Sequence, residues 1–276
     1  MNKANLTFIG GGNMARSIVM GLLADGYNPD RICVTNRTLD NLTFFQEECK
    51  VRTTQNNREG ITNADIIVLA VKPNQIKGVC EELTGISCDF RPLIISVAVG
   101  VPIKLLQQWL KSDLAIIRAM PNAPVSVGAG ATALFASEQV TKQQRNLVES
   151  ILRVVGLVVW LSLENQIDAV AALSGSGPAY ISFVMEALQE AAKPLQLSKE
   201  VVQLLIAQTV LGTARMFLEK EQNVVQLRRF VTSPGGITEQ AMKILELGNL
   251  PKLFDNALRA ALQRARELSA ALEKAV

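Results

Sequence analysis

The chain has 276 residues, a hydrophobic fraction of 49% and a formal net charge of +3. This length fits two domains better than one, and the apolar fraction is sufficient for both cores. The absence of histidine excludes histidine-based acid–base catalysis and histidine-ligated metals, and we expect no metal site. The basic residues are scattered apart from the pair Arg228-Arg229, so we expect no nucleic-acid partner.

Neither a secretory signal nor a membrane helix is expected. Three glycines at positions 10–12 interrupt the apolar N-terminal stretch, which is untypical of a signal peptide. The longest uncharged run, residues 169–185, contains the turn-forming segment 174–178, which disfavours a membrane span. The cysteines form no C-x-x-C pair and are typical of buried thiols in a reducing compartment: Cys33, Cys49, Cys80 and Cys88. We therefore expect a cytoplasmic protein.

Residues 1–161 alternate short apolar runs with amphipathic stretches. The runs are mostly β-branched or leucine, and turn residues bound them, which predicts a doubly wound, mostly parallel sheet with helices on both faces. They lie at residues 6–9, 31–35, 66–70, 93–97 and 114–118. Residues 128–135 and 154–161 are candidates to extend the sheet.

The strand pattern stops near residue 161, and helical periodicity replaces it. We therefore predict an N-terminal α/β domain over residues 1–161 and an all-helical domain over residues 162–276. The helix around Ile181, Phe183, Met185 and Leu188 is apolar on several faces, and such a helix must be buried. Since the helical domain is short, we expect a partner subunit to bury it in a homo-oligomer.

The first apolar run ends in a glycine motif, Gly10-Gly11-Gly12-Asn13-Met14-Ala15. It fits the pattern G-x-G-x-x-A, in which the first glycine makes a tight turn and the second admits a pyrophosphate to the backbone. A plain turn is the alternative. The position between a predicted strand and a predicted helix favours a Rossmann dinucleotide-binding site, with the helix N-terminus facing the phosphates.

The second predicted strand is followed by Asn36 and Arg37. Enzymes that use NAD favour an acidic residue there, which binds the ribose 2′-hydroxyl. Arg37 can instead pair with a 2′-phosphate through its planar guanidinium; a solvated loop arginine is the alternative. We therefore expect NADPH to be preferred over NADH.

Two further strand ends border the predicted cofactor crevice. Ala70-Val71-Lys72-Pro73 follows one strand, with Pro73 suited to begin a helix, and Val97-Ala98-Val99 follows the next. Small residues there leave room for a nicotinamide. Either segment is equally compatible with an ordinary strand-to-helix turn.

In the helical half, residues 231–239 place a Gly-Gly turn before a predicted helix. Free N–H groups at a helix start form an anion site, and Ser233 and Thr238 add hydroxyls. The equally weighted alternative is an ordinary helix start, with Thr238 as N-cap and Glu239 in the first turn.

This segment and three others together resemble pyrroline-5-carboxylate reductases. The resemblance rests on residues 232–238, 70–73, 120–122 and 168–180, in the order and spacing of that family, and it covers essentially the whole chain. It implies reduction of 1-pyrroline-5-carboxylate to L-proline with NADPH, or with NADH, and an assembly that is a dimer or a ring of dimers.

The resemblance also implies a role for each matching residue. In the cofactor cleft these are Ile9, Gly10, Gly11, Gly12, Asn13 and Met14 at the pyrophosphate, Asn36 and Arg37 at the ribose, Asn57 near the adenine, and Ala70, Val71, Lys72, Pro73, Val97, Ala98 and Val99 along the remainder. On the substrate side they are Ser233, Gly235, Gly236, Ile237, Thr238 and Glu164. Thr238 would contact the ring nitrogen, and Glu164 would favour its protonated form.

Two positions depart from the family pattern. Phe230 stands where an asparagine that can touch the cofactor of the neighbouring subunit is frequent, and Ala123 stands where threonine is common. The first departure puts a polar contact between subunits in doubt, and the second removes a hydroxyl near the nicotinamide.

Two other functions fit a two-domain chain of this kind. A hydroxyacid dehydrogenase needs a positioned base, usually lysine or histidine, and no lysine follows the segment at 174–178 before Lys193. A non-catalytic NADPH-sensing module is the second alternative, and the intact substrate-side motifs argue against it.

Overall fold

The computed structural model describes residues 4–84, 91–219 and 223–274. Its packing divides the chain into two compact units. We call Met1–Ser176 together with Ala261–Val276 the sheet unit, and Gly177–Ala260 the helical unit.

The sheet unit is built on eight strands in the order β3-β2-β1-β4-β5-β6-β7-β8. The strands are β1 (Leu6–Ile9), β2 (Ile32–Thr35), β3 (Arg52–Thr54), β4 (Ile66–Leu69), β5 (Leu93–Ser96), β6 (Ile116–Met120), β7 (Gly130–Ala136) and β8 (Gly156–Trp160). All neighbours are parallel except β6 and β7. The strand order reverses between β1 and β4, which is the Rossmann arrangement and creates a crevice at the carboxyl ends of these strands. The predicted fold class is confirmed.

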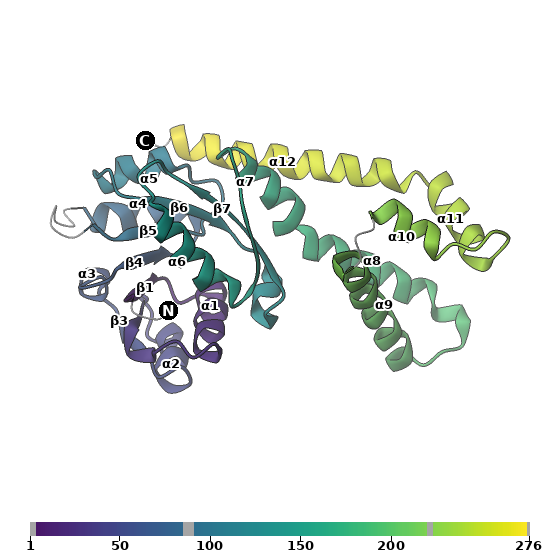
Figure 1. Ribbon diagram of the computed structural model, residues 1–276, viewed down its shortest axis with the longest axis horizontal. Coiled ribbons are helices and arrows are strands. Elements are labelled where there is room, and N and C mark those ends of the chain that lie inside the picture. Colours follow the sequence, from purple (N-terminus) through teal and green to yellow (C-terminus); the bar gives the residue numbers. More distant parts are fainter. Residues whose placement is uncertain (1–3, 85–90, 220–222, 275–276) are drawn as a thin grey trace. The chain divides into compact units, whose positions relative to one another are not determined.

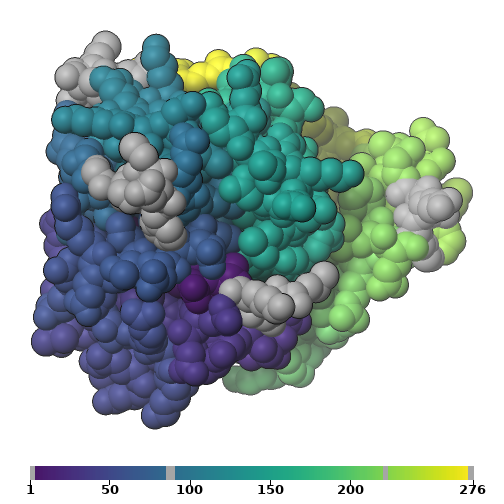
Figure 2. All heavy atoms as spheres, turned by 60° about the vertical axis from the view of Figure 1, so that its left-hand side comes forward, coloured from purple at the N-terminus to yellow at the C-terminus, as the bar shows by residue number. Residues whose placement is uncertain are grey.

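Helices cover both faces of this sheet, as a doubly wound fold requires (Figure 1). One hydrophobic core joins β1 and its neighbours to α1 (Asn13–Ala24), α2 (Asp40–Glu47) and α6 (Lys142–Arg153). A second core joins the opposite face to α4 (Pro73–Glu82) and α5 (Ile103–Leu110). In Figure 2 the purple N-terminal residues lie directly against blue and teal segments of the same unit.

Two features of the mostly parallel sheet were not specified by the sequence prediction. Strand β3 was not predicted, because its three residues, Arg-Thr-Thr, contain no apolar run and are at best partly buried. Strand β7 runs antiparallel to β6. The connection between them, residues 121–129, is shorter than the dozen or so residues that a parallel crossover needs.

The helical unit contains α8 (Gly177–Ala191), α9 (Lys199–Glu219), α10 (Val224–Phe230), α11 (Ile237–Leu247) and the first part of α12 (Leu250–Lys274). Helix α12 starts in this unit and ends in the sheet unit, since residues from Ala261 onward pack there. Among the described residues of the helical unit, only Val202 and Leu227 are buried, whereas Phe183 and Leu204 are 70% and 71% exposed. The chain by itself therefore leaves much of this apolar surface uncovered.

The packing boundary lies C-terminal to the predicted domain boundary at residues 161 and 162. Helix α7 (Gln166–Val170) and the π-turn Ala171–Gly175 belong to the sheet unit, because Ile167 and Ala171 pack with Met120 of β6. The domain division at residue 161 stays a prediction.

Two stretches, Gln166–Ala191 and Lys199–Glu219, are long and apolar enough to fit a membrane span. Helices that pack against a second protein surface meet the same criterion of length and composition. The stretch at Gln166–Ala191 includes the π-turn at Ala171–Gly175.

Candidate active site

A cavity of about 370 Å³ lies at the carboxyl ends of β1, β2 and β4. It occupies the point where the strand order reverses, the position at which such sheets bind ligands. Nine of the residues predicted to bind the cofactor line it: Ile9, Gly10, Gly12, Asn36, Arg37, Asn57, Ala70, Val71 and Lys72. The structure therefore brings together segments that are separated by some sixty residues in the sequence.

Gly10 and Gly12 differ in what surrounds them. Gly10 has φ +105°, and a Cβ there would lie 2.5 Å from the carbonyl oxygen of Ala70, so no other residue fits this turn. A Cβ on Gly12 would have no protein atom within 4 Å. Gly12 is also the N-cap of α1 and makes no side-chain capping bond, so the first N–H groups of the helix are available to an anion. This cradle fits a pyrophosphate.

The other members of the glycine motif lie close by. A Cβ on Gly11 would lie 3.0 Å from the ring of Phe45, so this glycine allows α2 to approach. Asn13 and Met14 line a second cavity of about 660 Å³, together with Asn122, Ala123 and Gly175. The departure at Ala123 therefore lies in a cavity wall.

The ribose-side loop follows β2 and is held by local hydrogen bonds. The Thr38 backbone N–H donates to Oδ1 of Asn36 (3.0 Å), and Nε2 of Gln55 donates to the carbonyl oxygen of Arg37 (2.7 Å). The side chain of Arg37 is exposed and forms no ion pair with any residue that the structure describes. Its guanidinium is thus available to a 2′-phosphate.

Asn57 is buried in the wall of the cofactor cavity rather than extended into it. Its Oδ1 accepts from the Thr35 hydroxyl (2.5 Å), and its Nδ2 donates to Oε2 of Glu82 (2.9 Å). These bonds hold β2, α3 (Asn57–Gly60) and α4 together. The sequence analysis missed Thr38, Asn41 and Gln75, which also line the cavity. Their signal is a polar residue one to four positions beyond a predicted site residue.

The two remaining cofactor segments follow β4 and β5. Pro73 begins α4, as predicted, with Lys72 as the N-cap. Residues Val97, Ala98 and Val99 do not line either of the two cavities; Ala98 is buried, and Val99 packs beside Met120 and Ile167. Their place in the cofactor cleft stays a prediction.

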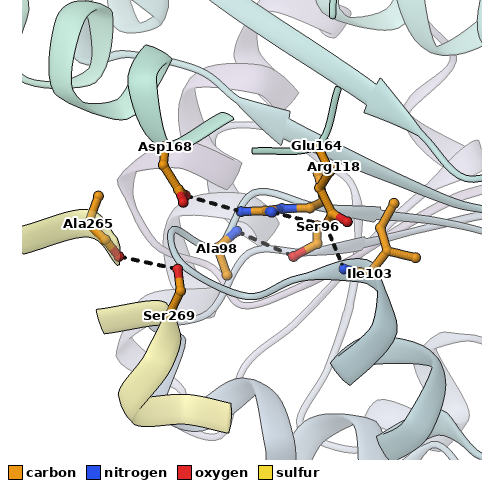
Figure 3. A network of polar contacts seen from close by, with 8 residues as sticks. All are labelled: Ser96, Ala98, Ile103, Arg118, Glu164, Asp168, Ala265 and Ser269. Atoms are coloured by element: carbon orange, nitrogen blue, oxygen red, sulfur yellow. Dashed lines mark hydrogen bonds and ion pairs between the residues drawn. The ribbon is translucent and has the colours of Figure 1, made fainter. Parts of the chain in front are cut away.

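Glu164 lies in a partly buried polar network, in which the Arg118 side chain is 5% exposed and its own is 30% exposed (Figure 3). Its Oε1 accepts hydrogen bonds from the backbone N–H of Ile103 (2.7 Å) and from Nη1 of Arg118 (3.0 Å). Oδ1 of Asp168 lies 3.9 Å from Nη2 of Arg118. Burial raises the pKa of the Asp168 carboxyl, and the charges of Arg118 and Arg266 oppose this rise. Sequence reasoning missed Arg118, although a charged residue within a buried strand was the signal.

The predicted substrate loop belongs to the helical unit. Gly235 has φ +73°, and the backbone N–H of Gly236 donates to the carbonyl oxygen of Ser233 (3.0 Å), which forms the predicted turn. Helix α11 starts at Ile237 with Gly236 as its N-cap and without a side-chain capping bond. Its first N–H groups are therefore available to a carboxylate.

The alternative that Thr238 caps this helix is wrong, because the N-cap is Gly236 and Thr238 lies within the first turn. Oε2 of Glu239 accepts from the backbone N–H of Gly235 (3.1 Å), and this bond, followed by Lys243, lowers the pKa of the Glu239 carboxyl. The hydroxyl of Thr238 has no capping role. Ile237 is 91% exposed and Phe230 is 67% exposed.

Two family models match the chain. The model for pyrroline-5-carboxylate reductase dimerisation matches residues 164–268. The model for NADP oxidoreductase, coenzyme F420-dependent, matches residues 5–100. The first match covers the helical unit, and the second covers the strands that form the cofactor cavity.

Relatives match over nearly the whole length. A pyrroline-5-carboxylate reductase of Pseudomonas aeruginosa is 39% identical over 98% of this chain and 98% of its own. The chain belongs to the pyrroline-5-carboxylate reductase family. A solved pyrroline-5-carboxylate reductase from Coxiella burnetii is 65% identical, with a TM-score of 0.92 over 97% of this chain and 99% of its own. The Plasmodium falciparum enzyme, solved with NADP bound, is 27% identical, with a TM-score of 0.85 over 98% and 99%. The resemblance stated from the sequence is confirmed.

Proposed function

We propose that this pyrroline-5-carboxylate reductase family member reduces 1-pyrroline-5-carboxylate to L-proline with NAD(P)H. The observation that carries the proposal is the cavity at the strand-order reversal, with its glycine turn and the open helix N-terminus at Gly12. It is supported by full-length relatives named pyrroline-5-carboxylate reductase. The protein then performs the last step of proline formation.

For the cofactor, NADPH is preferred over NADH. The support is the exposed Arg37 beside the ribose end of the cavity, with no acidic residue among the cavity-lining residues. A guanidinium gains charge-assisted hydrogen bonds from a 2′-phosphate that NADH lacks. The Plasmodium falciparum relative was solved with NADP.

The reaction adds a hydride to the C=N carbon of a cyclic imine, and the ring nitrogen ends as an amine. The nicotinamide supplies the hydride when the cofactor is bound. The backbone N–H groups of Ile237 and Thr238, at the open start of α11, hold the substrate carboxylate, with Ser233, Gly235 and Gly236 shaping the loop. The Thr238 hydroxyl hydrogen-bonds to the ring nitrogen, and the negative charge of Glu164 favours the protonated imine. No strong base is needed, in agreement with a chain that contains no histidine.

The protein acts in the cytoplasm as a homo-oligomer, at least a dimer, with a ring of dimers as the larger assembly. The dimerisation model covers residues 164–268, which include both apolar helices, α8 and α9. A second subunit buries Phe183 and Leu204, since surfaces of this apolarity on isolated helices mark protein contacts.

One assay separates this function from its alternatives. NADPH oxidation is followed with pyrroline-5-carboxylate, and NADP⁺ reduction is followed with a panel of 2-hydroxy acids. Turnover of the imine alone supports the proposal. Turnover of hydroxy acids alone would establish a dehydrogenase, and NADPH binding without turnover of either would establish a sensing module.

A further inference from the structure

Arg118 is an unusual residue for its position. It lies in the middle of β6, where it pairs with Ser96 of β5 and Phe135 of β7, and the other four residues of this strand are apolar and buried. Its own side chain is only 5% exposed. A buried guanidinium destabilises the folded protein unless its charge is paired, so the residues that pair with Arg118 indicate its role.

One partner, Glu164, also contacts the start of helix α5, which follows the predicted cofactor residues 97–99 in the sequence. The Oε1 atom that accepts from Arg118 also accepts from the backbone N–H of Ile103, the first residue of α5. The N-cap of α5 is Pro102, which supplies no side-chain cap. Glu164 therefore caps α5 from a distant part of the chain, and its charge favours the positive end of the helix dipole.

Helix α5 directly follows the loop 97–101, which contains the predicted cofactor residues Val97, Ala98 and Val99. The last turns of α12 approach this loop closely. Gly100 has φ +74°, and a Cβ there would lie 3.4 Å from Oγ of Ser269. Figure 3 shows both Ser269 and the Arg118 network next to this loop. Glu164 thus contacts the first residue of the helix that follows this loop.

We propose that Arg118 is a positioning residue of the reductase, which holds Glu164 on the first N–H of α5 and so fixes the loop 97–101. The proposal rests on the proposed function, because that function makes the loop a wall of the cofactor cleft. Arg118 lines neither the cavity at the strand-order reversal nor the second cavity beside Asn13 and Met14, so its proposed role is to act through Glu164. Asp168, 3.9 Å from Nη2, is a second, weaker partner.

The test uses four variants and two independent readouts. Arg118→Met removes the charge, Glu164→Gln keeps an acceptor oxygen, and the double variant combines them. Arg153→Met is the control, because it removes an arginine that pairs with Glu149 on the surface of α6. The first readout is hydrogen exchange at the Ile103 amide at single-residue resolution, and the second is kcat and KM for pyrroline-5-carboxylate beside Kd for NADPH.

We expect Arg118→Met to speed exchange at Ile103 by about tenfold or more and to lower kcat by roughly 10- to 100-fold, the loss of one charge-assisted bond. The Kd for NADPH should change by no more than a few-fold, because two strands, β4 and β5, separate β6 from β1 and the glycine turn that follows it. In the double variant the loss should be close to that of the worse single variant, since both changes act through one contact. Arg153→Met should change neither readout.

Unchanged exchange at Ile103 in Arg118→Met would overturn the proposal, as would fully additive losses of kcat in the double variant. If Arg118→Met does not fold, Arg118→Lys replaces it, since lysine keeps the charge without the planar fork. Unchanged exchange at Ile103 in Arg118→Lys would then overturn the proposal. If the wild-type protein does not reduce pyrroline-5-carboxylate, the proposed function fails. Exchange at Ile103 still decides whether Arg118 holds the start of α5.

Discussion

The sheet unit buries most of its apolar residues within itself, whereas the helical unit leaves most of its apolar residues exposed. In the sheet unit every residue of β1, β2, β4 and β5 is buried. In the helical unit α8 and α11 have no buried residue. The hydrophobic effect scales with the apolar area removed from water, so the first unit carries its own stability and the second needs a partner. The cofactor cavity lies in the self-sufficient unit, and the predicted substrate loop lies in the dependent one.

The largest expected effect comes from placing a charge on the exposed face of α8. Phe183→Glu keeps a good helix former but puts a carboxylate where a second subunit is expected to pack. The dimer should weaken by about 2–4 kcal/mol, roughly 30- to 1,000-fold in Kd, as measured by sedimentation across a dilution series. Leu39→Glu, at a residue 59% exposed in the sheet unit, is the control. Equal dissociation constants for the two variants would show that α8 is not in the interface.

The two glycines of the cofactor turn should separate stability from binding. Gly10→Ala forces an alanine to φ +105° and against the Ala70 carbonyl. The cost is about 1–3 kcal/mol of strain, or roughly 2–12 °C in Tm. Gly12→Ala meets no protein atom, so Tm should stay nearly unchanged while the Kd for NADPH rises. Calorimetry and a fluorescence titration measure the two effects. A normal Kd in Gly12→Ala would remove the pyrophosphate from this turn.

Thr238 tests the substrate loop of the dependent unit. If its hydroxyl bonds the ring nitrogen, Thr238→Ala should lower kcat and kcat/KM together by about 5- to 150-fold, the equivalent of 1–3 kcal/mol. The Tm should stay close to that of the wild type, because Gly236 is the N-cap and the substitution removes no capping bond. Thr238→Ser keeps the hydroxyl and should recover most of the turnover. Normal turnover in a folded Thr238→Ala would show that the hydroxyl takes no part in the reaction.

Arg37 should give a smaller and more selective effect within the sheet unit. Arg37→Ala should raise the KM for NADPH by roughly 10-fold, which corresponds to the smallest free energy usual for a charge-assisted hydrogen bond. The KM for NADH should stay nearly unchanged. Since the side chain is exposed and forms no described ion pair, the fold should be unaffected. Steady-state kinetics with each cofactor provide the comparison. An equal rise for both cofactors would place the 2′-phosphate elsewhere.

The sequence predicted the sheet unit well because its signals are local. Buried parallel strands are short apolar runs, and the G-x-G-x-x-A pattern encodes a turn that a Cβ at Gly10 would block. Strand β3 escaped because an edge strand of Arg-Thr-Thr has no such signal. The antiparallel direction of β7 depends on the length of its connection, which the apolar pattern does not show.

The candidate site was less predictable where it depends on contacts distant in sequence. The place of Glu164 beside the substrate stays a prediction. Its capping of α5 and its pairing with Arg118 were not predicted, because they join residues that lie 61 and 46 positions apart. Thr238 was equally suited to a cap until the backbone showed that Gly236 takes that place. Residue types limit which roles are available, and only packing assigns them.

We expect the sheet unit to bind the cofactor by itself, whereas turnover needs the helical unit to be covered by a partner. Phe183→Glu, diluted until it sediments as a monomer, tests this claim in a single sample. NADPH binding by fluorescence and NADPH oxidation with pyrroline-5-carboxylate are measured side by side. We expect a Kd for NADPH close to that of the wild type and little turnover. A monomer that turns over at the wild-type rate would contradict the account.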